Sequence, residues 1–175
     1  MILVDPELDS QPIPQSTPAK QSTVPAARTL ARFLREARTA VSLRGRVTVL
    51  LTTDAKIRRL NREFRGKNKA TDVLSFPALG PAAEGIAGDL AVSVPTAARQ
   101  AVEHGHNVGT EIKILILHGL LHLAGYDHET DQGRMARREA KVRARLRLPL
   151  GLIERAKSGA RDASRGARRA KEARS

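Results

Sequence analysis

Three of the five histidines in this sequence, His118, His122 and His128, have the spacing of a catalytic metal site. Residues four apart lie one above the other on a helix, so His118 and His122 project from one face with Cβ atoms about 5–6 Å apart. Gly125 follows as a helix stop whose backbone can adopt positive φ and turn His128 back toward the first pair. Three neutral imidazoles with one open position suit zinc and its bound water. We therefore predict one Zn²⁺ per chain, held by these three side chains.

Metallopeptidases with the pattern H-E-x-x-H-x-x-G-x-x-H share this spacing, but here Gly119 occupies the position of their glutamate general base. Peptide hydrolysis by that mechanism needs the carboxylate to accept a proton from the metal-bound water. The sequence therefore disfavours a peptidase. Asp127 is the carboxylate nearest in sequence that is able to replace that glutamate. Three roles are open to it: a general base, a partner of a ligand histidine, or a turn former. The remaining histidines, His104 and His106, lie in the polar sequence EHGHN, which predicts surface positions.

The elements that must position these residues are a mixture of helices and strands. Apolar spacing predicts four strands, at residues 1–5, 46–52, 72–77 and 88–94, and five helices, at residues 26–41, 54–64, 95–102, 110–124 and 131–148. Residues 110–124 form the most apolar of these helices, so we expect a buried helix that carries two of the three histidines. The pattern predicts a single α+β domain with a sheet of about four strands packed by about five helices.

Composition divides the chain into three segments. Residues 1–25 combine a first strand with a proline-rich linker, residues 26–150 form the metal-binding domain, and residues 151–175 form a basic tail that we expect to be disordered. The chain has no cysteine, so a metal must be held by histidine or carboxylate. No segment approaches the roughly 20 apolar residues of a membrane-spanning helix. We therefore expect a cytoplasmic protein.

The charge of the chain indicates a polyanionic partner. Lys and Arg total 31 against 18 Asp and Glu, a net charge of +13, which favours nucleic acid. Residues 56–69 and 134–147 each hold seven bases and one acid, enough for a phosphate-binding surface if they share a face. Aromatic residues make up only 2%, so contact with RNA would depend on phosphate charge rather than base stacking. Alternatively, these bases only form solvent-exposed helix faces and bind no partner.

Three motifs together resemble one known family. The chain carries HGLLHLAGYDHETD, LNREFRGKNKATDVLSFP and GDL, which resemble the YbeY family of metal-dependent endoribonucleases that mature ribosomal RNA. The likeness covers about residues 46–147 in the same motif order. It implies a zincin-like fold, with His118, His122 and His128 as zinc ligands. It also implies that Arg65 is the active-site arginine and Asp89 the acid of the family's Gly-Asp pair.

The same resemblance implies a biological role and partners. It points to a single-strand-specific enzyme that matures the 3′ end of small-subunit (16S) ribosomal RNA and takes part in ribosome quality control. The implied partners are ribosomal RNA in the small ribosomal subunit, a small-subunit ribosomal protein and the GTPase Era; we expect neither DNA nor a membrane. The proline-rich segment and the basic tail depart from the family pattern, so no role carries over to them.

Cleavage of an RNA phosphodiester needs a nucleophile and neutralisation of charge on the phosphoryl oxygens. A zinc ion can supply hydroxide or act as a Lewis acid, and the sequence favours neither role. Arg65, in the loop-like sequence RGKNK, can bind two phosphate oxygens at once, with Lys67 and Lys69 as weaker contacts. Asp89 opens an apolar strand, where an unpaired carboxylate is costly. We therefore expect Asp89 to pair with a ligand histidine or with Arg65, unless it faces solvent.

One rival function belongs to another class. A zinc-stabilised ribosome-assembly factor would bind ribosomal RNA without cutting it, and the absence of an identified general base keeps that alternative open. The two differ in what the metal does, because a structural zinc contributes to folding itself. Substitution of a ligand histidine would then lower stability as well as function.

Overall fold

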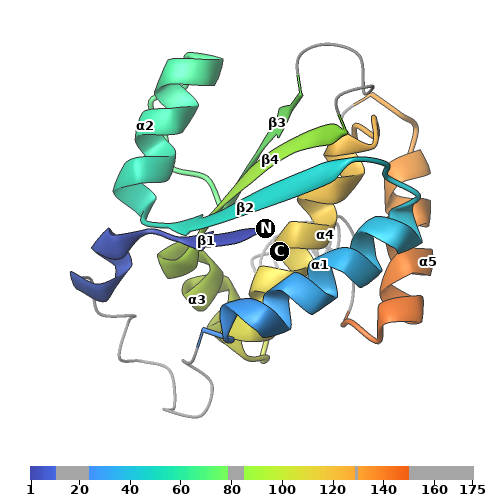
Figure 1. The fold of residues 1–175 in the computed structure, drawn as a ribbon, viewed down its shortest axis with the longest axis horizontal. Coiled ribbons are helices and arrows are strands. Elements are labelled where there is room, and N and C mark those ends of the chain that lie inside the picture. The colour runs from blue at the N-terminus through green and yellow to red at the C-terminus, as the bar shows by residue number, and fades with distance from the viewer. Residues whose placement is uncertain (11–23, 79–84, 129, 150–175) are drawn as a thin grey trace, which may run out of the picture.

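One mixed sheet organises the described part of the chain, residues 1–10, 24–78, 85–128 and 130–149 of a computed structural model (Figure 1). Its strands are β1 (Ile2–Val4), β2 (Arg46–Thr52), β3 (Val73–Pro77) and β4 (Ile86–Ser93), in the order β1-β2-β4-β3. β1, β2 and β4 run parallel, whereas β3 pairs antiparallel with β4 at one edge. The four predicted strands are thus confirmed.

Five α-helices pack around this sheet in the described residues. They are α1 (Ala27–Val41), α2 (Asp54–Arg65), α3 (Val94–Glu103), α4 (Val108–Leu123) and α5 (Arg134–Leu146), and a short 3-10 helix, η1 (Pro6–Ser10), follows β1. Each α-helix lies within a few residues of its predicted position. The predicted α+β architecture is therefore confirmed.

Polar side chains begin three of the helices at or near the ends of strands and turns. Thr53, Ser93 and Asn107 each accept the backbone N–H three residues further on, and so begin α2, α3 and α4. Such caps satisfy amide groups that lie beyond the helix's own hydrogen bonds. Thr53 directly follows β2 and Ser93 ends β4, so at both places a single capping residue ends the strand and begins the next helix.

The sheet separates two apolar layers of unequal size. The larger layer lies under α1, α3, α4 and α5, and the alternate β2 residues Val47, Val49 and Leu51 are buried in it. The smaller layer lies under α2, where Ile57 packs with Leu74 of β3. Each fully buried large apolar side chain stabilises the fold by about 1.5–3 kcal/mol, so the larger layer provides most of the core.

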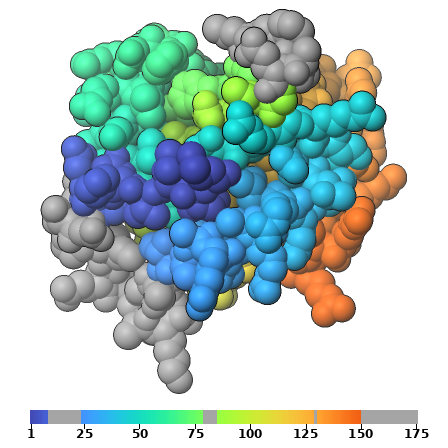
Figure 2. Space-filling model, in the orientation of Figure 1, coloured from blue at the N-terminus to red at the C-terminus, as the bar shows by residue number. Residues whose placement is uncertain are grey.

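α4 is the central helix of the larger layer. It is buried along most of its length, as its apolar sequence predicts, and it contacts α1, α3, α5, β3 and β4. Figure 2 shows β1 and α1 beside each other on one surface of the molecule, with α2 and α5 on opposite sides of that view. A helix held from so many sides provides a rigid base for the side chains at its end.

Two of the predicted segments lie largely or wholly outside the described residues. These are the proline-rich linker within residues 1–25, of which residues 11–23 are not described, and the basic tail, residues 151–175. Among the helices that the structure describes, none combines the length and apolar character needed to span a membrane.

Candidate metal centre

The last turns of α4 bring two histidines together. His118 and His122 lie one helical turn apart, with ring centroids separated by 4.8 Å. Their Nε2 atoms face each other at 3.2 Å. The prediction that both rings project from one face of a helix is confirmed.

The turn after α4 adds the third imidazole. Gly125 has φ +84°, and its N–H donates to the His122 carbonyl at 2.9 Å, while the Tyr126 N–H donates to the Leu121 carbonyl at 3.0 Å. The reversed chain places the His128 ring with its centroid 5.4 Å from those of both His118 and His122. Each histidine thus offers one nitrogen, and the three nitrogens lie within 4.8 Å of one another.

The donor set fits a metal ion. A tetrahedral ion about 2.0–2.1 Å from each imidazole nitrogen holds its donors about 3.3 Å apart, close to the 3.2 Å between the Nε2 atoms of His118 and His122. Burial lowers the pKa of His122, and the neighbouring His118 and His128 rings lower it further. The neutral form that binds metals is therefore favoured. This group could hold a metal ion, and its chemistry alone does not identify which.

Access to the centre is from one side. His118 is 5% exposed, His122 is half-buried and His128 is exposed. The centre therefore extends from the protein interior to the surface, where a large substrate can reach it. A metal site enclosed on all sides would not allow this.

Gly119 lies where α4 packs against β3 and β4. A Cβ atom at this position would lie 2.7 Å from Cδ2 of Leu90 and 3.2 Å from Oγ of Ser75. The Ser75 hydroxyl donates to the Gly119 carbonyl at 3.4 Å. Packing against Leu90 of β4 and Ser75 of β3 therefore disfavours a glutamate at this position.

Comparison with known proteins identifies the family. The family profile described as Endoribonuclease YbeY matches residues 14–147. A relative of that name from Koribacter versatilis is 50% identical over 140 residues, 80% of this chain and 90% of its own. The chain belongs to the YbeY family. A further relative of the same name, from Solibacter usitatus, is 54% identical over 127 residues, 73% of this chain and 84% of its own.

A solved structure has a similar fold. The solution structure of a Thermotoga maritima protein is similar, with a TM-score of 0.50 and 25% identity, covering 84% of this chain and 92% of that one. The predicted zincin-like α+β fold and its three-histidine group are confirmed. The prediction of an endoribonuclease, a hydrolase that acts on RNA, is confirmed at the level of the YbeY family.

Arg65, the arginine implied by the YbeY resemblance, is the last residue of α2 rather than part of the following loop. Gly66 ends the helix with φ +67°, and Asn61 orders the loop by donating to the Lys69 carbonyl at 2.7 Å. Arg65 is exposed. Among the described residues, no hydrogen bond or ion pair joins Arg65 to the histidines, and its catalytic role stays a prediction.

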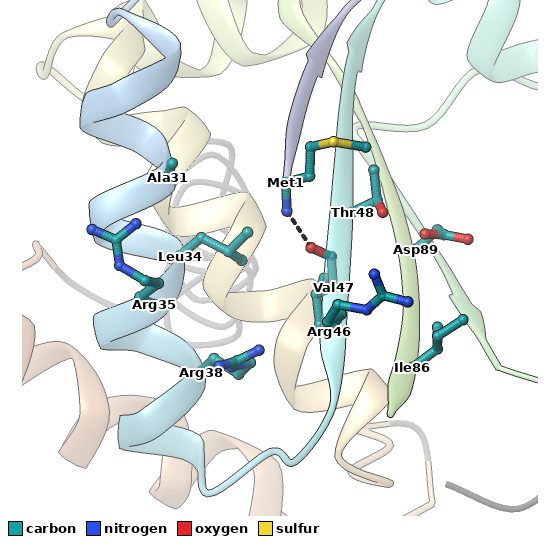
Figure 3. A pocket seen from close by; sticks show the side chains of 10 residues that line it. All are labelled: Met1, Ala31, Leu34, Arg35, Arg38, Arg46, Val47, Thr48, Ile86 and Asp89. Carbon is teal, nitrogen blue, oxygen red and sulfur yellow. Dashed lines mark hydrogen bonds between the residues drawn. The ribbon is translucent and has the colours of Figure 1, made fainter. Parts of the chain in front are cut away.

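Asp89, the acid of the YbeY Gly-Asp pair, lies on the opposite face of the sheet from the larger core layer. Its neighbour Leu90 is buried in that layer, so strand alternation directs Asp89 away from it. Figure 3 shows Asp89 beside Thr48 and near Arg46, in a pocket that also includes Met1. The expected pairing with a ligand histidine or Arg65 is wrong; Asp89 is exposed, which was the alternative.

The glycine of that YbeY pair has a packing role. Gly88 has φ +144°, and a Cβ atom there would collide with the backbone oxygen of Phe76. Only glycine allows β3 and β4 to approach this closely at that point. The Gly-Asp motif therefore combines a structural glycine with an exposed acid.

The predictions for the other two histidines and for Asp127 meet different outcomes. His106 was predicted at the surface, but its side chain is only 12% exposed and it bonds to the fully buried Glu111; that surface prediction is wrong, because a buried carboxylate requires a partner. His104 is exposed, as predicted. Asp127 accepts the Asp131 N–H at 3.0 Å through its carbonyl, which supports the turn-forming alternative.

One buried acid near the YbeY histidines was missed from the sequence. Glu139 of α5 lies with Oε2 3.4 Å from Nδ1 of His118, and it is 1% exposed. A signal was present, because Glu139 falls on the same helical stripe as the apolar residues Met135 and Val142, which are both buried. An acid on an apolar stripe predicts a buried partner.

The second basic run, residues 134–147, is not a single surface. Arg143 is buried and donates to Glu139 Oε1 at 2.9 Å, and Arg138 donates to the Ala40 carbonyl at 2.9 Å. In contrast, the basic side chains of α2 are largely exposed. Only part of the charge excess is therefore available to a polyanion.

Proposed function

We propose that this chain is a zinc-dependent endoribonuclease that cleaves single-stranded ribosomal RNA, with the 3′ end of small-subunit (16S) precursor RNA as its main target. The observation that carries the proposal is the convergence of three imidazoles at the end of α4, with donor nitrogens within 4.8 Å, in a chain of the YbeY family. The target and the zinc come from the family resemblance. The net charge of +13 supports a polyanionic substrate.

His118, His122 and His128 would hold the zinc ion. When bound, zinc supplies an activated water or polarises the phosphoryl group. His118 fixes the inner side of the centre from its buried position, while the exposed His128 leaves the outer side open to RNA. The neutral form of His122 is kept available because burial and the neighbouring rings lower its pKa.

Arg65 and Asp89 complete the proposed catalytic set. The Arg65 guanidinium is exposed at the end of α2 and would bind phosphate oxygens and stabilise their developing charge. Asp89 would act on the exposed part of the sheet face that α2 partly covers. Figure 3 shows the Arg46 guanidinium extending there toward β4. An acid there can orient an arginine toward the RNA backbone.

The wider assignment follows from the resemblance. We assign the activity to residues 26–150, and treat residues 1–25 and 151–175 as additions without an assigned catalytic role. The proposed partners are the small ribosomal subunit, a small-subunit ribosomal protein and the GTPase Era. Such partners place the activity in the cytoplasm, in ribosome maturation and quality control.

The decisive experiment compares wild type with His122→Ala on a precursor fragment of small-subunit ribosomal RNA. Both proteins are purified identically and checked for folding and for zinc content. Cleavage by wild type alone supports the proposal, and equal cleavage by both reveals a contaminating nuclease. Cleavage by neither, also with a ribosomal partner added, would overturn the proposal and favour an assembly factor that binds ribosomal RNA without cutting it.

A further inference from the structure

The buried contacts of His118 divide its two ring nitrogens between two tasks. Nε2 faces the second histidine, at 3.2 Å from Nε2 of His122. Nδ1 faces the other way, toward Oε2 of Glu139 at 3.4 Å. A ring bound through Nε2 must keep its other nitrogen protonated or hydrogen-bonded elsewhere, and a carboxylate is a suitable acceptor for that proton.

Glu139 is held as an acceptor by its other oxygen. Oε1 receives a hydrogen bond from Nε of Arg143 at 2.9 Å, one helical turn further along α5. Arg143 is itself buried, and its Nη1 donates to the Pro149 carbonyl. Because an arginine side chain can only donate hydrogen bonds, Oε1 of Glu139 accepts from Arg143, and Oε2 is the oxygen that faces His118 Nδ1.

We propose that Glu139 is a positioning residue for the metal centre: it accepts the Nδ1–H of His118 and so fixes the tautomer in which Nε2 presents its lone pair to the metal. Arg143 orients Glu139 in turn. This inference rests on the proposed metal-dependent function, and it connects α5 to a centre whose direct ligands all lie on α4 and the following turn. It replaces Asp89 as the acid that supports a ligand histidine.

The chain supplies a matched control at the other end of α4. Glu111 is also a fully buried glutamate paired with a half-buried histidine, His106, but these two residues belong to no group of metal-type donors among those described. Loss of the Glu111 charge therefore measures the cost of breaking a buried histidine–glutamate pair. Any change in the His118 tautomer or in zinc affinity that occurs in a Glu139 variant but not in the Glu111 variant then measures the effect of Glu139 on the metal centre.

The first readout needs no metal and no substrate. In metal-free wild type labelled with ¹⁵N-histidine, long-range ¹H–¹⁵N NMR spectra should show His118 protonated at Nδ1 and unprotonated at Nε2. Glu139→Gln should shift His118 toward a mixture of tautomers, whereas Glu111→Gln should leave it unchanged. The same His118 tautomer in wild type and Glu139→Gln would overturn the proposal.

The second readout is zinc affinity, measured by competition with a chromophoric chelator. Glu139→Gln should weaken zinc binding by about 10–100-fold, and Glu111→Gln should keep it within about threefold. Because Glu139→Gln leaves the Arg143 charge buried, Glu139→Gln/Arg143→Met removes both charges and should fold while showing the same loss of affinity. Zinc affinity equal to wild type in this double variant would overturn the proposal.

These readouts separate the two hypotheses. If wild type binds zinc through its histidines but does not cut RNA, the proposed function fails while the role of Glu139 in His118 tautomer and zinc affinity stands. If wild type cuts RNA and Glu139→Gln matches it in tautomer and affinity, the positioning role fails while the function stands.

Discussion

The two ends of α4 each carry a buried histidine–glutamate pair, but only one end can hold a metal. At the start of the helix His106 bonds to Glu111, and near its end His118 contacts Glu139. Both glutamates are buried, at 0% and 1% exposure. The difference lies in the neighbours: His118 has two more imidazoles within bonding reach of one ion, whereas no such group forms around His106 among the described residues. The exposed His104 ring has its centroid 6.1 Å from that of His106.

This comparison shows that a buried histidine–glutamate pair is not in itself a functional signal. Glu111 lies in the first turn of α4, where the helix dipole favours negative charge, and its pair with His106 joins the helix to the preceding turn. The pair at the other end is similar in chemistry but is part of a convergent donor set. Convergence of donors, rather than burial, distinguishes the candidate metal centre.

The strongest test of this comparison removes the histidine from each pair. His118→Ala should abolish stoichiometric metal binding and lower RNA cleavage by at least about a thousandfold, because the metal contributes several kcal/mol to the transition state. His106→Ala should keep cleavage within about threefold and lower the free energy of unfolding by about 1–3 kcal/mol. Single-turnover cleavage and urea denaturation measure the two effects. Loss of cleavage in His106→Ala at full folding would contradict the comparison.

A second prediction concerns the arginine that lies outside both pairs. Arg65→Ala should lower cleavage by about a hundredfold, because one charged donor to the phosphate is lost, while zinc affinity stays unchanged. Arg62→Ala is a suitable control, since Arg62 is an exposed arginine on the same helix. If both variants lose activity equally, Arg65 acts only through the general charge of α2.

Much of this molecule could be predicted from its sequence, because its signals are local. The helix and strand periods gave the right elements, and the i, i+4 histidines with Gly125 predicted the three-imidazole group. The partners of buried charges could not be predicted in this way, because they come from distant elements. Glu139 reaches His118 from 21 residues away, and the direction of Asp89 depended on which side of β4 faces α4.

The end of α4 that carries the metal ligands also depends on a glycine. Gly119→Glu should lower the free energy of unfolding by about 3 kcal/mol, because the new side chain meets Leu90 and Ser75 and buries a charge. Gly119→Ala should lower it by about 1 kcal/mol, since the flexible end of Leu90 and the Ser75 hydroxyl must shift. Thermal and urea unfolding measure both. Peptide hydrolysis by a stable Gly119→Glu variant would contradict our account of this position.

A third buried carboxylate, Asp5, extends the comparison to a buried acid whose partners are not histidines. Burial raises its pKa, but hydrogen bonds from the Thr52 hydroxyl, the Glu7 N–H and the Lys56 ammonium outweigh burial and hold the pKa below the ordinary 3.8. A lowered pKa gives stability that is present above the unfolded value and is lost as pH falls through the folded one. Asp5→Asn should therefore cost about 1 kcal/mol at pH 7, and the cost should shrink below pH 4.

Urea denaturation of wild type and Asp5→Asn at pH 7, 5 and 3 measures this effect. The contributions of the other acids to the free energy of unfolding cancel when the variant is compared with wild type at the same pH. Cleavage should be unchanged at pH 7, since Asp5 follows β1 and donates its N–H to the Leu51 carbonyl near the end of β2 rather than contacting the histidines. A cost of the same size at every pH would show that the charge of Asp5 contributes nothing to stability.

The central claim is that one metal ion held by three histidines enables this chain to cut RNA. The most direct measurement titrates zinc into metal-free protein and records bound zinc and RNA cleavage in the same samples. We predict that cleavage rises with bound zinc and reaches its plateau at one ion per chain, and that folded His128→Ala shows neither the binding nor the rise. Full cleavage by the metal-free protein, or by His128→Ala without bound zinc, would contradict the claim.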